Sequence, residues 1–249
     1  FNLVKKLNEK YKILLIFPDR KYKSYFDINN IENIILDGFR PNSKNIFNEI
    51  RTIWNLFLIY KKFKPNLSIH YTIKPNIYGV FLSKILKIKS LNNITGLGNT
   101  YINNNFLNRI IIQIYFFSQR YATYIIFQNS YDLDDFKKIS NIKNFNIIQS
   151  SGVDTNYFFP KKISIKNNDN VISFLMISRI IKEKGVNEFL ESSKIISTYF
   201  KNEKYKINFI LIGDNYNDDL YQKLIKYSSF NYLKYIEHSD NIREHIANS

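Results

Sequence analysis

Short apolar runs alternate with amphipathic segments along most of the chain. The runs span four to seven residues, are rich in Ile, Leu and Phe, and predict strands. They are residues 12–17, 33–36, 67–71, 91–95, 124–128, 145–149, 171–177, 207–213 and 232–236. Apolar residues at helical spacing predict helices at 44–63, 76–87, 106–121, 131–139, 186–200, 218–228 and 241–248. Continuous apolar strands alternating with helices are typical of a parallel sheet buried on both faces. The pattern therefore predicts an α/β fold with doubly wound parallel sheets.

The alternation stops between residues 150 and 170. This stretch is polar, carries a Gly and a Pro, and shows no periodicity before Val171. The break predicts two domains, residues 1–155 and 171–249, joined by a linker at 156–170. Phe1 lies inside an apparent helix, and the chain stops just where another strand is due. We therefore expect two Rossmann-like domains, the first without its first strand and the second without its C-terminal part.

Composition narrows the function classes. The 249 residues are 45% hydrophobic and contain no cysteine, which excludes a disulfide framework, a thiolate metal site and a cysteine nucleophile. The net charge of +15 favours an anionic partner, such as nucleic acid, acidic lipid or a phosphorylated ligand. The basic residues are spread along a chain that over-uses Lys, Asn and Ile, which favours a generally basic surface over a nucleic-acid face. No run approaches the roughly 20 apolar residues needed to span a bilayer.

Ligands of two-domain α/β proteins bind beyond the carboxyl ends of the strands, so residues that follow strands are the candidates. His70 ends its strand, and its imidazole either polarises a bound hydroxyl or bonds to a neighbouring carbonyl as a half-buried structural group. The loop "NITGLGNTYI" offers Thr95 and close backbone approach at Gly96 and Gly98, although an ordinary tight turn has the same spacing.

The pair Asp132 and Asp134 invites interpretation as a metal site. Asn129 or Ser130 is a good N-cap for the helix that follows, and acids in a first helical turn complement its dipole. We therefore interpret the pair as part of a helix start and expect no metal there.

The segment "SRIIKEKG" places Arg179 at a strand end and Lys184 beside the start of a helix. The N-terminus of a helix attracts anions, and the planar guanidinium binds phosphate oxygens in pairs. Arginine is rare in this lysine-rich chain, so its presence here favours a diphosphate site over a solvated turn. Glu183 and Glu191 share a Glu-x7-Glu spacing, but we interpret both as solvent-facing charges.

Seven segments together resemble the retaining family-4 glycosyltransferases, which have two Rossmann-like domains in the GT-B fold. The likeness is greatest to the bacterial enzymes that build polyprenyl-diphosphate-linked glycans for capsule, O-antigen or protein glycosylation. The segments are 70–79, 93–102, 125–136, 150–158, 177–186, 209–214 and 235–249. They occur in the family's order, each at the expected strand end.

The resemblance implies roles for matching residues in the second domain. Arg179 and Lys184 would clamp the diphosphate of a nucleotide sugar and stabilise charge on the leaving nucleotide. Asp214, His238 and Asp240 would border the nucleotide. No metal or other cofactor is expected, because the cationic pair replaces a divalent ion.

In the first domain, the resemblance implies that His70 faces the transferred sugar as a catalytic residue. Thr95, Gly96 and Gly98 would line the acceptor side, and Asn129 would be structural. The family's carboxylate pair, Glu-x7-Glu, is expected beyond Ser249, so residues 1–249 alone should be inactive or strongly impaired.

The implied activity is transfer of a hexose or N-acetylhexosamine from a nucleotide sugar, UDP-linked by expectation, to a polyprenyl-diphosphate-linked glycan. Such an enzyme would work in the cytoplasm at the acidic inner surface of the cytoplasmic membrane, without nucleic acid. The alternatives are a nucleotide-sugar epimerase or hydrolase of the same fold, an inactive truncated product, and a basic nucleic-acid-binding protein. The last would need aromatic residues interleaved with basic ones on an exposed face.

Overall fold

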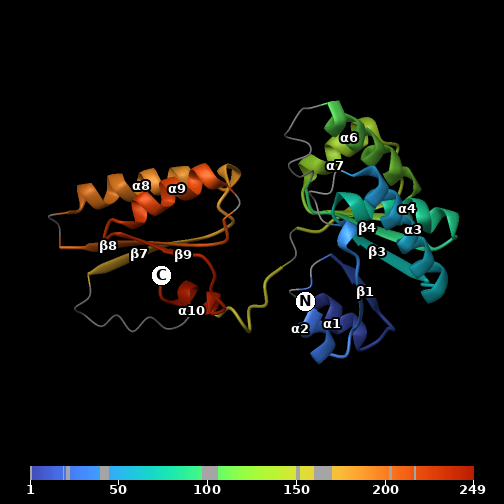
Figure 1. The fold of residues 1–249 in the computed structure, drawn as a ribbon, viewed down its shortest axis with the longest axis horizontal. Coiled ribbons are helices and arrows are strands. Elements are labelled where there is room, and N and C mark those ends of the chain that lie inside the picture. Colours follow the sequence, from blue (N-terminus) through green and yellow to red (C-terminus); the bar gives the residue numbers. More distant parts are fainter. Residues whose placement is uncertain are drawn as a thin grey trace. The chain divides into compact units, whose positions relative to one another are not determined.

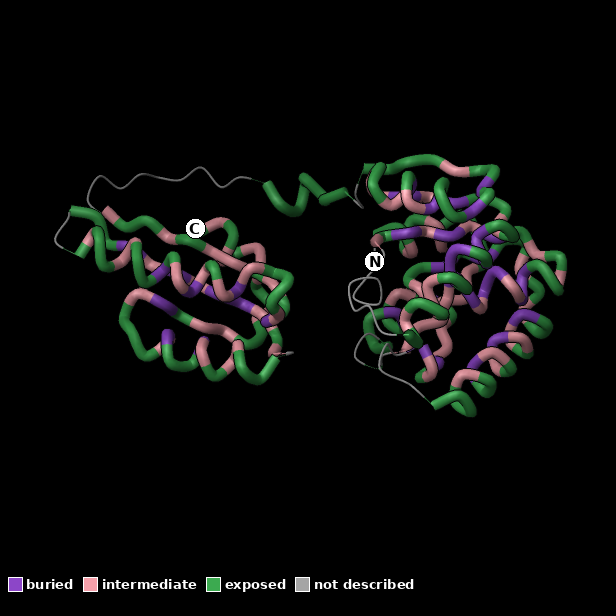
Figure 2. The backbone as a smooth tube through the Cα atoms, turned by 90° about the horizontal axis from the view of Figure 1, so that it is seen from above, coloured by how far each residue is buried: buried purple, intermediate pink, exposed green. Residues whose placement is uncertain are grey.

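A computed structural model describes most of the chain as two compact units, Phe1–Gly152 and Val153–Ser249. The described residues are 2–18, 20, 23–39, 45–96, 106–149, 152–159, 170–201, 204–215 and 217–249. Figure 1 shows strands flanked by helices in both units, and Figure 2 shows exposed positions alternating with buried ones along the helices.

The first unit contains two parallel sheets. Strands β1 (Leu14–Phe17) and β2 (Glu32–Ile35) form a pair. The larger sheet has the order β3-β4-β5-β6, with bounds Leu67–Tyr71, Lys89–Ile94, Tyr124–Phe127 and Phe145–Ile147. The α-helices are α1 (Asn2–Asn8), α2 (Lys23–Ile28), α3 (Ile46–Phe63), α4 (Ile73–Ile85), α6 (Phe106–Ser118) and α7 (Ser130–Ile139). Two 3-10 turns, η2 (Asp37–Phe39) and η3 (Gln119–Tyr121), complete the described elements.

Aromatic side chains fill the core around the larger sheet. The Phe136 ring of α7 lies 4.4 Å from the Phe116 ring of α6 and 5.3 Å from the Phe127 ring of β5, centroid to centroid. All three side chains are almost fully buried, and burying one phenylalanine contributes roughly 1.5–3 kcal/mol. A second cluster, which includes Leu56 and Leu82, packs α3 against α4.

The second unit has one parallel sheet of order β7-β8-β9, with bounds Val171–Ile177, Lys206–Ile212 and Leu233–Ile236. Helices α8 (Val186–Tyr199) and α9 (Asp218–Ser228) lie together on one face of this sheet, and α10 (Ile242–Ala247) lies on the other (Figure 1). The 3-10 turn η4 (Lys182–Lys184) precedes α8. Buried apolar side chains of the strands and of α8 and α9 form its core.

All nine predicted strands and all seven predicted helices are present, and their sheets are parallel as predicted. The predicted bounds 67–71, 171–177 and 218–228 are the same as the observed bounds of β3, β7 and α9. The prediction did not include the six-residue helix α2, because so short a segment shows too little periodicity.

The predicted linker, 156–170, lies mostly outside the described residues. Its described start packs within the second unit, since the Arg243 guanidinium of α10 lies 5.2 Å from the Tyr157 ring and 4.4 Å from the Phe159 ring. Such cation–π contacts are worth roughly 0.5–1 kcal/mol at exposed sites. Residues 157–159 are therefore held by the second unit.

Candidate functional site

The carboxyl ends of β7 and β8 are tied together beyond the strands themselves. The Ser178 amide donates to the Ile212 carbonyl at 3.0 Å, and the Ile180 amide donates to the Asp214 carbonyl at 3.0 Å. A side chain at Gly213 would collide with the Ser178 carbonyl oxygen. These bonds set the backbone of Arg179 beside that of Asp214.

Arg179 and Lys184 occupy the two ends of a tight connection between β7 and α8. Both side chains are exposed. Gly185, with a φ of +74°, precedes the first residue of α8, and no side chain caps this helix start. The fourteen-residue helix thus presents free backbone N–H groups at the same edge as the two cations. This arrangement suits an anion such as a diphosphate.

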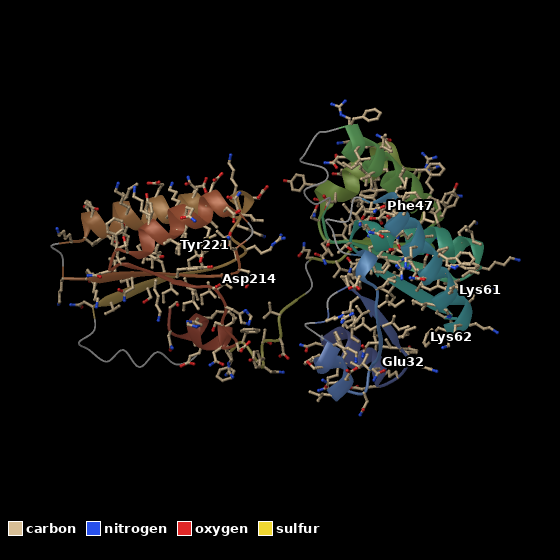
Figure 3. The ribbon with its side chains drawn as sticks, viewed as in Figure 1. Glu32, Phe47, Lys61, Lys62, Asp214 and Tyr221 are labelled. Atoms are coloured by element: carbon tan, nitrogen blue, oxygen red, sulfur yellow. The ribbon has the colours of Figure 1, made fainter. Side chains whose placement is uncertain are left out.

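Asp214, His238 and Asp240 also follow strands of this sheet. Asp214 comes after β8 and is exposed (Figure 3), and the other two follow β9. His238 Nε2 lies 3.2 Å from the Asp240 carboxylate on the protein surface. The structure therefore brings the five residues predicted in this unit to one edge of one sheet, while their roles stay predictions.

Tyr235, in β9, contributes to this edge without having been a candidate. Its hydroxyl donates to the Gly213 carbonyl at 2.9 Å and so supports the turn beside Asp214. Burial, and then the charges of Glu237, Tyr221 and Asp214, raise the pKa of Tyr235 to about 12. The phenol therefore stays a hydrogen-bond donor at neutral pH. It was not a candidate because it stands within an apolar strand, where only its hydroxyl distinguishes it from its neighbours.

His70 lies at the end of β3, where a ligand was expected, but its side chain points into the protein and is only 4% exposed. Nε2 lies 2.8 Å from the Tyr60 hydroxyl, and Nδ1 lies 2.7 Å from Asn92 Oδ1. Burial lowers the pKa of His70 to about 4, against a smaller opposing effect of the Asn92 bond. This geometry favours His70 as a structural residue that bonds to its neighbours. Contact between His70 and a sugar stays a prediction, and the buried position of the imidazole does not support it.

The hydrogen bonds around His70 define its tautomer. Gln119 Nε2 donates to Ser118 Oγ at 2.8 Å, so Gln119 Oε1 accepts from Asn92 Nδ2 at 2.5 Å. The Asn92 oxygen then faces His70, which must donate from Nδ1 and accept the Tyr60 proton at Nε2. The imidazole is neutral and fully bonded, and this buried network joins α3, β3, β4 and η3.

The acceptor-side candidates are described only in part. Thr95 is exposed just beyond β4, and Gly96 has a φ of +139° with open space where a side chain would be. Gly98 lies outside the described residues. The expected close approach of this loop to a ligand stays a prediction.

Two other interpretations from the sequence are decided. Asn129 is the N-cap of α7, since its Oδ1 accepts from the Asp132 amide at 2.8 Å, as predicted. Glu191 faces solvent as interpreted, since its side chain is 45% exposed, but it also forms an ion pair. Its carboxylate lies 2.6 Å from Lys223 Nζ, which joins α8 to α9 and holds the pKa of Glu191 below its usual range.

The chain is similar to enzymes that act on nucleotide sugars. No family model matches it. The N,N'-diacetylbacillosaminyl-diphospho-undecaprenol alpha-1,3-N-acetylgalactosaminyltransferase of Campylobacter jejuni is 27% identical over 227 residues, which cover 85% of this chain. The chain spans 58% of the length of that curated relative.

Solved structures share its architecture. HepE from Anabaena in complex with UDP-glucose matches with a TM-score of 0.70 at 14% identity, over 98% of this chain and 66% of HepE. The chain has the GT-B fold. A UDP-GlcNAc 2-epimerase from Methanocaldococcus jannaschii matches with a TM-score of 0.58 at 13% identity, over 98% of this chain and 70% of the epimerase. The GT-B fold, predicted from the seven segments, is confirmed, but it hosts both transfer and epimerisation.

Proposed function

We propose that this chain is part of a retaining, metal-independent glycosyltransferase. It would move a hexose or N-acetylhexosamine from a UDP-sugar to a polyprenyl-diphosphate-linked glycan. Residues 1–155 would serve the acceptor and residues 171–249 the nucleotide sugar, with 156–170 as the linker. The observation that carries the proposal is that Arg179, just beyond β7, and Lys184, just before the uncapped start of α8, lie at one edge of the sheet.

This arrangement fits the chemistry of glycosyl transfer. The acceptor hydroxyl oxygen forms a bond to the anomeric carbon, and the bond from that carbon to the diphosphate oxygen breaks. The nucleotide leaves with the electron pair, and its diphosphate takes up the proton of the acceptor hydroxyl. Negative charge then grows on the diphosphate, and fixed cations at that place lower the barrier. Two cations and a helix N-terminus supply the charge stabilisation that a divalent ion otherwise supplies.

The donor and acceptor classes follow from the relatives. The Campylobacter jejuni relative is named for transfer of N-acetylgalactosamine to an undecaprenol-diphosphate-linked sugar, and the HepE structure contains UDP-glucose. We infer a UDP-sugar and a lipid-linked glycan for this chain, and nucleic acid is not an expected partner.

None of the described helices is long and apolar enough to cross a membrane. We propose a cytoplasmic enzyme that attaches to the inner face of the membrane, because the acceptor is anchored there and the chain is strongly basic.

A product assay distinguishes the enzyme classes. The full-length protein is incubated with UDP-N-acetylgalactosamine, UDP-N-acetylglucosamine or UDP-glucose, with and without an undecaprenyl-diphosphate-linked glycan, in the presence of EDTA. We expect UDP release and an α-linked product only when the acceptor is present. UDP release without acceptor indicates a hydrolase, and isomerised sugar without a lipid-linked product indicates an epimerase. Loss of transfer in EDTA would overturn metal independence.

A further inference from the structure

Helix α3 is apolar on the side that faces away from its own unit. Its buried line is Thr52, Leu56 and Tyr60. The apolar face of α3, defined here as Ile46, Phe47, Ile50, Trp54 and Leu58, lies largely on the opposite side at helical spacing. Within this face Phe47 is 77% exposed, Trp54 59% and Leu58 47%.

A surface helix normally shows polar residues on its outer side, and a contiguous exposed apolar patch marks an interaction site. Beside this face lies an apolar groove of about 400 Å³, lined by Ile50, Ile53, Trp54, Phe57 and Leu82. The Trp54 and Phe57 rings stack there with centroids 5.5 Å apart. The helix thus offers aromatic rings beside an apolar recess.

Charge at the edges of this face is positive. Arg51, Lys61, Lys62 and Lys64 are exposed beside it or at its C-terminal end, and Figure 3 shows Phe47 and the two adjacent lysines on the same helix. Lys61 Nζ lies 5.5 Å from the Phe57 ring centroid.

The carboxylate of Glu49 in α3 does not offset the positive charge beside the apolar face. The structure describes every residue of α3, and Glu49 is the only acidic one among them. Its carboxylate accepts from Lys74 Nζ at 2.7 Å and from the Tyr78 hydroxyl at 2.6 Å, both on α4. The outward side of α3 is therefore apolar and cationic.

We propose that the apolar face of α3 docks on an acidic membrane surface, with its aromatic rings at the headgroup level and its lysines beside the anionic lipids. This inference rests on the proposed function, because the proposed acceptor is a lipid-linked glycan held in a membrane. Aromatic residues are favoured at membrane interfaces, and Lys or Arg side chains near an acidic surface strengthen the attachment. Charge favours lipid over a second copy of the chain, since pairing two such faces would bring like charges together.

Vesicle binding tests this surface directly, without donor or acceptor. Trp54 is the only tryptophan of the chain, so its fluorescence reports on this face alone. Vesicles of phosphatidylglycerol and phosphatidylcholine should shift its emission to the blue and sediment the protein, whereas pure phosphatidylcholine should do so weakly. The double variant Phe47→Ser/Leu58→Ser, which keeps Trp54, should bind at least about tenfold more weakly. Lys61→Glu/Lys62→Glu should lose the preference for phosphatidylglycerol.

A matched control separates docking from general stickiness. Ile195→Ser/Tyr199→Ser removes a comparably exposed apolar pair from α8 in the second unit and should leave binding unchanged. Equal binding by the α3 serine variant, with its thermal unfolding unchanged, would overturn the proposal. So would a blue shift that depends on protein concentration without vesicles, which would indicate a second copy. Transfer to a short-chain, water-soluble acceptor should survive in the α3 variants, and its absence in the unmodified protein would contradict the proposed function instead.

Discussion

Replacing Arg179 with alanine is expected to lower the turnover of the full-length protein by about 10²–10³-fold, with little change in its unfolding temperature. The side chain is exposed beyond β7, so its truncation opens no cavity in the core. The loss should fall on kcat more than on KM, because the charge that Arg179 would stabilise grows as the diphosphate leaves. Steady-state kinetics with a UDP-sugar and a lipid-linked acceptor measure it.

The neighbouring turn provides matched controls. Lys182 is an exposed cation of the same 3-10 turn, assigned no contact with the diphosphate, and Lys182→Ala should keep turnover within about twofold. Arg179→Lys keeps the charge but loses the planar fork, so its activity should be intermediate. If Arg179→Ala loses no more turnover than Lys182→Ala, the proposed diphosphate site is wrong.

Acidification is expected to destabilise the first unit between pH 6.5 and pH 4 through His70. The folded imidazole stays neutral because burial lowers the pKa of His70 to about 4, whereas in the unfolded chain the pKa is near 6.5. Between these values the unfolded state binds more protons, so the free energy of unfolding falls as pH falls. The loss is about 1.4 kcal/mol per pH unit and about 3 kcal/mol in total, and this histidine adds no pH dependence above 6.5.

Urea unfolding at a series of pH values, followed by Trp54 fluorescence, measures this slope in the unit that contains His70. His70→Asn can still donate to Asn92 but does not titrate. It should be less stable at pH 7.5, since it loses the bond to Tyr60, and its slope should be flatter. The matched control His245→Asn, in the second unit, should leave the Trp54-detected slope unchanged. Equal slopes in His70→Asn and the unmodified chain would show that His70 is not a buried neutral group.

Hydrophobic periodicity was enough to predict the framework. The run Val171–Ile177 and the turn after it place Arg179 at a strand end because the carboxyl ends of parallel strands share one edge. Asp214 follows β8 at the same edge, although only the family resemblance had marked it as a candidate. Which residues lie at the carboxyl edge of the sheet depends only on the order of the strands and on where each strand ends. Both can be predicted from the sequence.

The surroundings of a side chain do not follow from chain order in this way. His70 occupies the predicted strand end, yet its bonding depends on Tyr60 of α3 and Asn92 of β4, which are separate elements. Nothing in the spacing shows which face of β3 the imidazole takes. The apolar face of α3 was likewise hidden, because helical spacing shows that a segment has an apolar side but not how much of that side its neighbours cover.

His70 and Gly79 of α4 share one volume in the core of the first unit. A Cβ at position 79 would collide with the imidazole ring, so the helix can approach β3 this closely only when residue 79 has no side chain. The two positions are therefore not free to change independently in evolution. Homologues with a side chain at position 79 should have a residue smaller than histidine at position 70, so variation at one position constrains the residues accepted at the other.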